Sequence, residues 1–486
     1  MYSKTHSLII KGHLVEKVQI ETSITKGMYS FSIIGVNSRY EKFIREKTRT
    51  LLKRMDIRLP NRNIVVNIQS SLFEITNTNL ELAIICSILG AMGLVNNKKD
   101  YYYIAELDLT GNLIAIKDSY RYIYEAYRQG IQNLFLPYND KLLHLTDKVH
   151  VRIPNNLYDV IHYLQTNKPL SIPSPYLPFP KQYNLTINNL IGHQKLIRAL
   201  IIAVAGHHHT LISGPSGVGK TLSLRLLYSI LPTLSIPDML AVNAFNPQEN
   251  VFIERPLLIW TQLNLNANSL IGKIDDLGIL NKAKQSFLIF DELNSYSNQV
   301  IDLLKMVMEN NVLSYETQDT KVNVLNDATI LATMNLCPCG NFGNNLSSCS
   351  CSKTDIEKYN KKIDDSLIER FHIVINLSPP SDKSGQTYNL DQIQENIKRA
   401  WQRQNQRYKD KIVKSNGRIN NITLLERILF DKESELLYER IINSKQYSQR
   451  QIMTILRLSR TIADYEDLDL ISTDHIKEAI GYIKVY

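Results

Sequence analysis

Eight consecutive residues near the middle of the chain match the phosphate-binding loop pattern GxxxxGK[ST] at every fixed position. They are Gly214, Pro215, Ser216, Gly217, Val218, Gly219, Lys220 and Thr221. The apolar run 210–213 before them predicts a buried strand, and residues 222–231 after them predict a helix. In such a loop backbone N–H groups surround a β-phosphate, the lysine reaches the β- and γ-phosphates, and the threonine hydroxyl ligates Mg²⁺. A chance glycine-rich loop is the alternative, and because the flanking elements disfavour it we expect a nucleoside triphosphate to bind here.

Two further apolar runs end in polar residues that such a site needs. Residues 287–290 lead into Asp291 and Glu292, about 70 residues after the loop, a separation typical of a second nucleotide motif. Asp291 would hold the Mg²⁺ shell, and Glu292 would orient and deprotonate the attacking water. Residues 329–334 lead into Asn335, which is either a γ-phosphate or water contact or an ordinary turn residue. Strands with polar tips separated by helices predict an α/β fold with a parallel sheet and the ligand at its carboxyl edge.

Four of the five cysteines are clustered directly after Asn335, in a CxC-x9-CxC arrangement of Cys337, Cys339, Cys349 and Cys351. In a reducing compartment such a cluster favours a metal over disulfides. Four thiolates close a tetrahedral zinc shell and leave no open position, so we expect a structural zinc ion that braces the loop beside the nucleotide. Redox-labile thiols and a chance cluster remain the alternatives.

Composition sets limits on the protein class. The 486 residues are enough for two to four domains, and 44% hydrophobic and 21% charged residues are ordinary for globular proteins. No stretch approaches a membrane span, and the first residues lack a secretory signal, so we expect a cytoplasmic protein without membrane contact. The net charge of +9 permits a polyanionic partner such as nucleic acid without establishing one.

The pattern of the chain divides into successive regions. Residues 1–165 alternate between strand-like and helical runs, and 166–187 form a proline-rich linker. The nucleotide-binding domain is expected to span 188–382, and the remaining residues, 383–486, are almost entirely of helical pattern.

Taken together, the motifs resemble the ComM/YifB-type proteins, AAA+ ATPases related to the ATPase subunit of magnesium chelatase. Beyond the phosphate loop, the likeness is carried by Leu-Ile-Gly-His-Gln at 190–194 and Ala-Thr-Met-Asn-Leu-Cys-Pro-Cys-Gly at 332–340. It continues in Ser-Leu-Ile-Glu-Arg-Phe at 366–371, Ser-Gln-Arg at 448–450 and Leu-Ser-Arg-Thr-Ile-Ala-Asp at 458–464. In the first region, Phe-Ser-Ile-Ile-Gly-Val at 31–36 and Ala-Glu-Leu-Asp-Leu-Thr-Gly at 105–111 match as well. The resemblance therefore spans nearly the whole chain.

This resemblance implies a fold and a set of residue roles. It implies a Lon-protease-like (ribosomal S5-type) α+β domain, an AAA+ module of the chelatase kind and a C-terminal helical lid. By the same likeness Asn335 corresponds to sensor 1, Arg370 to an arginine finger that acts on the neighbouring subunit's site, and Arg450 to sensor 2 on the lid. Arginines that act between subunits imply a homo-oligomeric ring, expected to be a hexamer. The first domain departs from a protease: residues 73–80 lack the nucleophile turn, and no lysine is placed to activate Ser70 or Ser71.

Three functions follow as hypotheses. The first is an ATP- and Mg²⁺-dependent ring motor on single-stranded or branched DNA, a ComM-like helicase that drives branch migration in natural transformation. The second is a chelatase-type ATPase that remodels a protein partner for metal insertion without DNA activity. The third, an ATP-dependent protease, is disfavoured because the Ser–Lys pair is missing.

Overall fold

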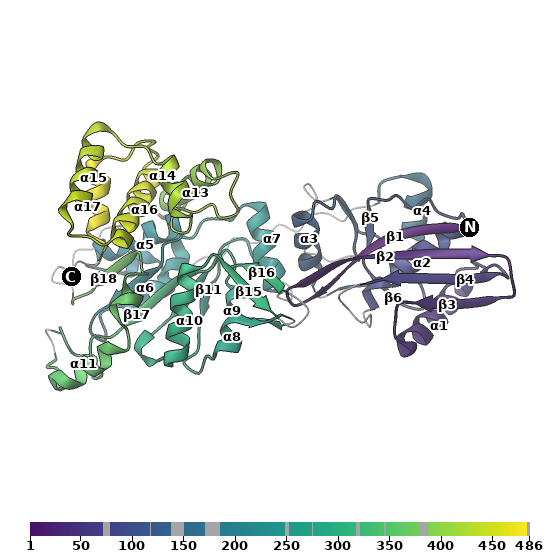
Figure 1. The fold of residues 1–486 in the computed structure, drawn as a ribbon, viewed down its shortest axis with the longest axis horizontal. Coiled ribbons are helices and arrows are strands. Elements are labelled where there is room, and N and C mark those ends of the chain that lie inside the picture. Colours follow the sequence, from purple (N-terminus) through teal and green to yellow (C-terminus); the bar gives the residue numbers. More distant parts are fainter. Residues whose placement is uncertain are drawn as a thin grey trace. The chain divides into compact units, whose positions relative to one another are not determined.

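The computed structural model describes residues 1–70, 78–116, 118–137, 150–170, 185–247, 252–274, 276–316, 321–344, 347–379 and 387–483. The chain folds into two compact units, each with its own hydrophobic core (Figure 1). Unit 1 comprises Met1–Phe179, Ile236–Ile253 and Ile274–Asp276, and unit 2 comprises Pro180–Ser235, Glu254–Lys273 and Leu277–Tyr486. Most of the predicted linker 166–187 lies outside the described residues, as do Ser71 and most of the segment 73–80. The predicted boundaries between the four segments 1–165, 166–187, 188–382 and 383–486 therefore stay predictions.

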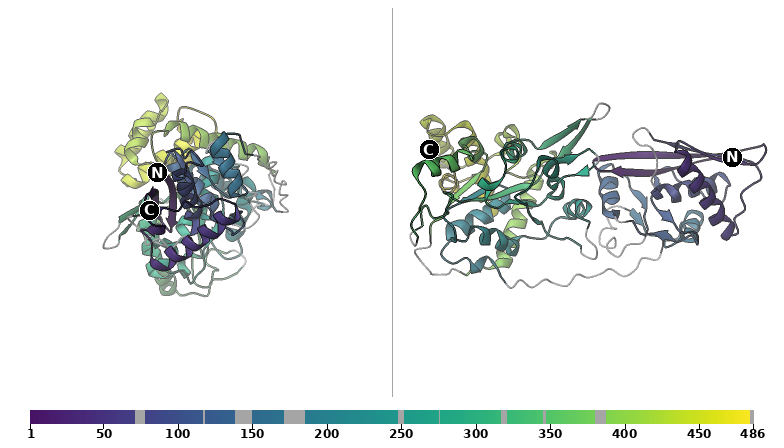
Figure 2. Two further views of the ribbon diagram at one scale, coloured as in Figure 1. Left: turned by 90° about the vertical axis from the view of Figure 1, so that its right-hand side faces the viewer. Right: turned by 90° about the horizontal axis from the view of Figure 1, so that it is seen from below.

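Unit 1 is an α+β unit built on a mixed sheet. Among the described residues its sheet has seven strands in the order β3-β4-β2-β1-β5-β8-β9. Their bounds are β1 (Tyr2–Lys11), β2 (Leu14–Thr25), β3 (Ser30–Ile34), β4 (Asn63–Gln69), β5 (Tyr101–Tyr103), β8 (Asn133–Phe135) and β9 (His150–Arg152). The strands β1 and β2 form a long antiparallel hairpin, visible in purple in Figure 2. Polar and apolar residues alternate along the hairpin. The apolar side chains lie on the face that α2 (Glu81–Ala91) covers.

The remaining helices of unit 1 are α1 (Ser38–Arg54), α3 (Ser119–Arg128), α4 (Leu157–Thr166) and α7 (Ile236–Phe245), and a short β6 (Glu106–Leu107) pairs with β7 (Leu113–Ile114). The helix α7 comes from the middle of the chain and packs against α3. There the guanidinium of Arg121 lies 4.0 Å from the ring centre of Phe245, and Tyr124 meets the same ring edge-on. Unit 1 is consequently discontinuous in sequence, and the hydrophobic periodicity of the sequence did not predict this.

Unit 2 carries the parallel sheet that the sequence predicts. Within the described residues its five strands run in the order β11-β14-β17-β10-β18, and every neighbouring pair is parallel. Their bounds are β10 (Thr210–Ser213), β11 (Leu258–Trp260), β14 (Phe287–Phe290), β17 (Thr329–Met334) and β18 (Ile373–Asn376). Every residue of β10, β14 and β17 is buried, as expected for strands covered on both faces. The fold class is thus confirmed as a mixed α/β protein with a parallel sheet.

Helices surround this sheet and complete the core of unit 2. Those that precede or lie between the strands in sequence are α5 (Gln194–Gly206), α6 (Lys220–Leu226), α8 (Ala267–Ile271), α9 (Ile279–Lys282), α10 (Asn298–Glu309), α11 (Lys353–Lys361) and α12 (Asp365–Ile368). The C-terminal ones, yellow-green to yellow in Figure 1, are α13 (Leu390–Arg407), α14 (Asn421–Arg427), α15 (Lys432–Ser444), α16 (Gln449–Tyr465) and α17 (Thr473–Ile480). Strand residues such as Ile212 and Leu331 share one apolar cluster with Ile397 and Leu458 of these C-terminal helices. The predicted helical C-terminal region is therefore present, and it is packed onto the sheet.

Two further short strand pairs are β12 (Gly272–Lys273) with β13 (Asp276–Leu277), and the antiparallel pair β15 (Val312–Glu316) with β16 (Lys321–Leu325). Over the part of the chain that the structure describes, no helix has the length and apolarity needed to cross a membrane.

Candidate functional site

The predicted phosphate-binding loop lies at the carboxyl end of β10. Gly214, Gly217 and Gly219 have φ angles of 152°, 80° and 95°. These are conformations that glycine adopts most readily. At Gly214 a side chain is also excluded sterically, because a Cβ atom would lie 2.5 Å from the carbonyl oxygen of Leu377. The loop therefore needs glycine at this position for its close approach to the end of the neighbouring strand.

Lys220 begins α6 and lies inside the loop. Its side chain is buried, and its Nζ donates hydrogen bonds to the carbonyl oxygens of Gly214 (2.8 Å) and Pro215 (2.6 Å). Burial lowers the pKa of this ammonium, and the neighbouring Asp291 and Glu292 act in the opposite direction. A cation held by carbonyl dipoles at the mouth of a glycine-rich loop can exchange those acceptors for phosphate oxygens.

The two predicted Mg²⁺-binding residues meet across the sheet. The Thr221 hydroxyl lies 3.0 and 3.1 Å from the two carboxylate oxygens of Asp291, which follows β14 directly. Thr333 of β17 donates to the same carboxylate at 2.5 Å and accepts a hydrogen bond from the backbone N–H of Glu292 at 3.0 Å. Hydroxyl and carboxylate oxygens are the ligands that Mg²⁺ takes at such sites, so this donor set fits the ion. Its chemistry there would be to neutralise phosphate charge.

Glu292 adopts a strained backbone conformation at the same edge of the sheet. Its φ of 55° lies in the left-handed region, which non-glycine residues avoid. Such strain persists only where surrounding contacts impose it, and here the hydrogen bond to Thr333 contributes. Asn335 follows β17 and is half-buried. Because Lys220, Asp291, Glu292 and Asn335 all follow parallel strands, the fold brings these predicted residues to one edge.

The predicted arginines lie at the opposite edge. Arg370 precedes β18, whose first residue, Ile373, pairs with Thr210 at the start of β10. A four-residue strand spans about 13 Å, so the amino edge is well separated from the phosphate loop at the carboxyl edge. Arg450, the second residue of α16, lies with Arg370, because both pair with the carboxylate of Glu309 at the end of α10. The structure therefore does not bring either arginine to the phosphate loop of its own chain.

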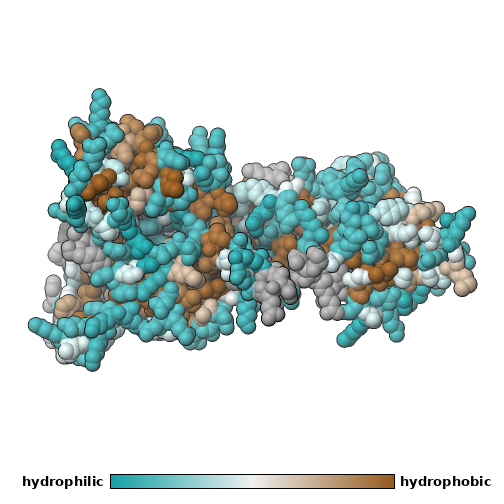
Figure 3. Space-filling view, in the orientation of Figure 1, coloured by the Kyte–Doolittle hydropathy of each residue, from teal (hydrophilic) through white to brown (hydrophobic). Residues whose placement is uncertain are grey.

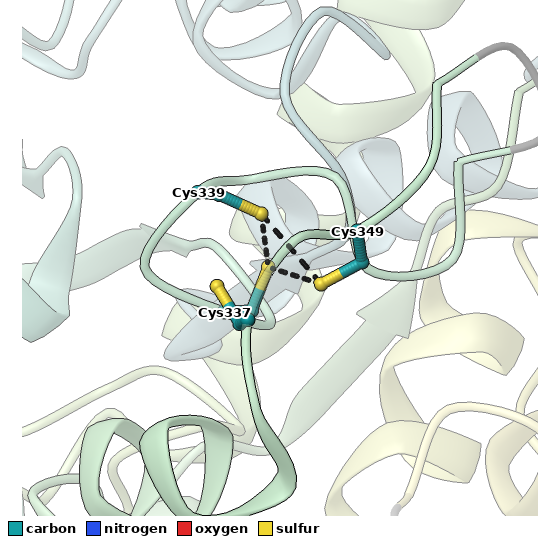
Figure 4. A group of neighbouring side chains, drawn as sticks. Cys337, Cys339 and Cys349 are labelled. Atoms are coloured by element: carbon teal, nitrogen blue, oxygen red, sulfur yellow. Dashed lines mark hydrogen bonds between the residues drawn. The ribbon is translucent and has the colours of Figure 1, made fainter.

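The four clustered cysteines do come together. Their four Sγ atoms all lie within 4.8 Å of one another. Figure 4 shows three of these thiols pointing at a common centre, with Sγ–Sγ distances of 3.4 Å (Cys337–Cys339), 3.6 Å (Cys339–Cys349) and 3.7 Å (Cys349–Cys337). Sulfurs around a tetrahedral zinc ion lie about 3.8 Å apart. The donor set and spacing are therefore compatible with zinc.

The cysteine loop also contacts the phosphate-binding loop. The carbonyl oxygen of Gly340 accepts a hydrogen bond of 2.8 Å from the backbone N–H of Ser216. Backbone N–H groups of Asn341 and Ser350 lower the pKa of the Cys339 thiol to about 5, which favours the thiolate that a metal binds. A metal in this cluster would therefore stiffen the segment that holds Ser216.

The consecutive histidines 207–209 do not form a metal site. His207 stacks between Phe287 and Trp401, with ring-centre distances of 5.9 and 5.3 Å. Nε2 of His208 lies 2.8 Å from the hydroxyl of Thr461, and Nδ1 of His209 accepts a hydrogen bond from the backbone N–H of Ile330 at 2.9 Å. Each ring thus has a structural role, although the strand that the sequence suggested here begins only at Thr210 and His207 is the C-cap residue of α5.

Ser70, which the sequence disfavours as a protease nucleophile, has an acidic neighbour. Its hydroxyl donates to the Glu16 carboxylate at 2.7 Å. Two functional candidates were missed by sequence reasoning: Thr333, which bridges Asp291 and Glu292, and Glu309, which joins the two arginines. The position of Thr333 two residues before Asn335 was a weak signal for the first, since alternate strand residues share a face. No local signal identifies Glu309.

Comparisons with known proteins agree with this architecture. Three family models match successive parts of the chain: "Subunit ChlI of Mg-chelatase" over residues 20–140, "Magnesium chelatase, subunit ChlI" over 186–384 and "Magnesium chelatase, subunit ChlI C-terminal" over 389–483. Together they account for most of the 486 residues.

Individual relatives extend over nearly the same length. The chain is 24% identical to the competence protein ComM of Haemophilus influenzae, covering 96% of this chain and 94% of the relative. It is 23% identical to the uncharacterised protein YifB of Escherichia coli, covering 99% and 96% of the two chains. The magnesium-chelatase 38 kDa subunit of Cereibacter sphaeroides is 23% identical over a shorter stretch, which covers 26% of this chain and 43% of that subunit.

Proposed function

Because this chain belongs to the ComM/YifB-type AAA+ ATPases related to the magnesium-chelatase subunit ChlI, we propose that it is a ring-forming motor that couples ATP hydrolysis to movement along DNA. ATP would be the substrate, with Mg²⁺ as its cofactor. The observation that carries the proposal is the separation of the two halves of the hydrolytic machinery. The loop residues and acids lie at the carboxyl edge of the sheet, and the arginines lie at the amino edge.

We assign the residues of the carboxyl edge to binding and to activation of water. The loop 214–221 would hold the triphosphate, with Lys220 on its β- and γ-phosphates, and Asp291 with Thr221 would hold Mg²⁺. Glu292 would take the proton of the attacking water, and Asn335 would orient that water against the γ-phosphate. The oxygen of the attacking water forms a bond to the γ-phosphorus while the bond from that phosphorus to the oxygen that bridges to the β-phosphate breaks. The products are ADP and inorganic phosphate.

Arg370 and Arg450 would complete this site from a neighbouring subunit. Both arginines lie at the edge of the sheet opposite the phosphate loop of their own chain. They can therefore stabilise the charge that builds on the transferred phosphate only at the nucleotide site of a neighbouring subunit, across the interface between the two. The cavity beside them, about 630 Å³ in volume, is lined by Arg370, Arg418, Arg450 and Arg457 together with Glu309 and Glu369. A pocket in which arginines outnumber carboxylates suits a polyphosphate. A closed ring of identical subunits, which we propose to be a hexamer, supplies one such pocket to every site.

Exposed apolar residues on the C-terminal helices support association between subunits. Figure 3 shows brown, apolar surface over this part of unit 2. The exposed large apolar side chains of the C-terminal region include Ile422, Leu425, Leu429 and Leu436. Apolar surface of this kind is typical of protein interaction sites.

Two observations support DNA as the polymer that the ring binds and moves along. The chain carries a net charge of +9, and a relative that aligns over nearly its whole length is named a competence protein. A basic ring can hold the phosphate backbone of a single or branched strand in its channel while ATP turnover moves the subunits. Branch migration during uptake and recombination of DNA is the activity that best combines these features, and it places the protein in the cytoplasm.

The test is the ATPase rate at a fixed salt concentration with no DNA, single-stranded DNA, duplex DNA and a forked junction. We expect branched or single-stranded DNA to stimulate turnover and the wild-type protein to displace a strand from a three-way junction, with Lys220→Ala as the inactive control. An ATPase rate that ignores every form of DNA would count against the motor.

A second candidate is a chelatase-type ATPase that remodels a protein for metal insertion. The similarity to the 38 kDa magnesium-chelatase subunit favours it. It predicts stimulation of the ATPase by a protein partner and none by DNA, so the same assay separates the two functions.

A further inference from the structure

Glu309 connects two side chains that the chain places far apart in sequence. Its Oε1 atom lies 2.9 Å from Nη2 of Arg370 and also pairs with Nη2 of Arg450. The carboxylate comes from the end of α10, and the two guanidinium groups come from the segment before β18 and from the start of α16. One carboxylate therefore fixes the distance between two cations from separate elements.

The guanidinium group of Arg370 has a second contact that does not involve Glu309. Its Nη1 donates to the carbonyl oxygen and, at 2.7 Å, to the hydroxyl of Ser366, and 13% of its side chain is exposed. Arg450 and Glu309 are more open, with exposed side-chain fractions of 41% and 40%. The Nη2 groups of both arginines thus meet the carboxylate where solvent, or a ligand, can reach it.

Other arginines around the same cavity already have neutral acceptors. Arg418 donates to Oδ1 of Asn311 at 3.1 Å and to the carbonyl oxygens of Ala328 and Asn326. Arg457 donates to the carbonyl oxygen of Asn416 at 2.8 Å and to Oδ1 of Asn421 at 2.7 Å. These hydrogen-bond partners carry no charge, whereas Arg370 and Arg450 both pair with the carboxylate of Glu309. Without it the two guanidinium groups would repel each other.

We propose that Glu309 is a positioning residue for ATP hydrolysis between subunits. It holds Arg370 and Arg450 side by side until the triphosphate of a neighbouring subunit replaces it as their counter-ion. A triphosphate carries several negative charges and accepts from both guanidinium groups, so it can displace one carboxylate. This inference rests on the proposed function, because it requires the two arginines to act on a neighbour's nucleotide.

The first experiment compares Glu309→Ala, Glu309→Asp and Asp302→Ala. Asp302 lies on the same helix and its exposed carboxylate pairs with Lys305 at 3.4 Å, so it is a matched loss of charge. We expect Glu309→Ala to lower kcat about 10- to 100-fold, the cost of misplacing a catalytic group. Its KM for ATP should change less than about threefold, because the phosphate loop is at the other edge. Glu309→Asp should restore part of kcat, and Asp302→Ala should keep the wild-type value.

The second experiment mixes inactive subunits in one ring. Lys220→Ala subunits keep intact arginines, and Arg370→Ala subunits keep an intact loop, so their mixture should regain activity if hydrolysis occurs between subunits. Glu309→Ala should likewise be rescued by Lys220→Ala and should not be rescued by Arg370→Ala, since both lie on the arginine-donating face.

The outcomes separate the two ideas. If Lys220→Ala and Arg370→Ala fail to complement, the proposed function fails and this inference fails with it. If they complement while Glu309→Ala retains full kcat, or while Lys220→Ala does not rescue Glu309→Ala, only the role of Glu309 is overturned. A purely structural defect would lower the melting temperature of Glu309→Ala and would not show this pattern of rescue.

Discussion

Arg370 and Arg450 both form ion pairs with one carboxylate oxygen, Oε1 of Glu309, although 80 positions of the sequence separate them. The arrangement places both at the amino edge of a sheet whose carboxyl edge carries Lys220. Binding and completion of hydrolysis should therefore respond differently to mutation.

Lys220→Ala and Arg370→Ala should separate binding from turnover. Removal of Lys220 deletes the cation inside the phosphate loop, so we expect ATP binding to be lost. Removal of Arg370 leaves that loop intact, so ATP should bind with near wild-type affinity while kcat falls on the order of 10³-fold. Equilibrium binding of a fluorescent ATP analogue, measured beside steady-state ATPase, checks both. A similar loss of affinity in the two variants would contradict the separation of the edges.

Gly340→Ala should weaken nucleotide binding through the phosphate loop. Gly340 has a φ of 78°, and an added Cβ atom would collide with the hydroxyl of Ser216. Gly343→Ala is the matched control: its φ is 81°, and the nearest atom to its Cβ would be Cδ1 of Leu336 at 3.8 Å. Both variants should lose about 1 kcal/mol or more of stability from the backbone. We expect only Gly340→Ala to raise the Kd for ATP, by about 3- to 10-fold; equal Kd values would show that the cysteine loop does not support Ser216.

Zinc should co-purify with the chain in a ratio of one ion per subunit. Cys339→Ser removes one of four converging sulfurs, and we expect it to abolish stoichiometric zinc in elemental analysis and to raise the Kd for ATP, because the loop that holds Ser216 loses its brace. Cys86→Ala removes a buried thiol in α2 of unit 1 and should keep its zinc. Metal-free wild-type protein with normal ATP affinity would refute the structural role.

Unit 2 should lose stability between pH 6.5 and 4. Burial lowers the pKa of His207 to about 4 and that of His208 well below its ordinary value. The unfolded chain binds protons near pH 6.5 while these folded rings stay neutral, so their contribution is complete above pH 6.5 and is lost as the pH falls towards 4. For His207 alone this amounts to at most about 3 kcal/mol.

Fluorescence reports on this unit selectively, because both tryptophans, Trp260 and Trp401, belong to it. Urea unfolding followed at pH 7.5, 6.0 and 5.0 should show a falling midpoint. His207→Asn tolerates the observed φ of 55° and cannot titrate, so its dependence on pH should be shallower. A midpoint that is constant between pH 7.5 and 5.0 would contradict the assignment.

The sequence by itself determined the parts of this protein that depend on local spacing. The strand before the phosphate loop and the strands directly before Asp291 and Asn335 were predicted with the bounds that the structure has. The sequence also predicted that the sheet is parallel and that the four cysteines lie together. In each case the required residues lie within one strand–turn unit or one short loop, so the pattern of neighbours specifies the geometry. The roles of all the predicted site residues, from Lys220, Thr221 and Asp291 to Glu292, Asn335, Arg370 and Arg450, stay predictions.

Only the tertiary structure decided which distant segments meet. The contact of Gly340 with Ser216, the shared acid Glu309 and the inclusion of residues 236–253 in unit 1 have no signature in any window of sequence. The first of these arises where β10 and β17 align in one sheet, and the other two depend on how helices pack, α7 against α3 and the start of α16 near the end of α10. Such contacts depend on the order and register of strands, which hydrophobic periodicity does not encode, because the same alternation is compatible with many pairings.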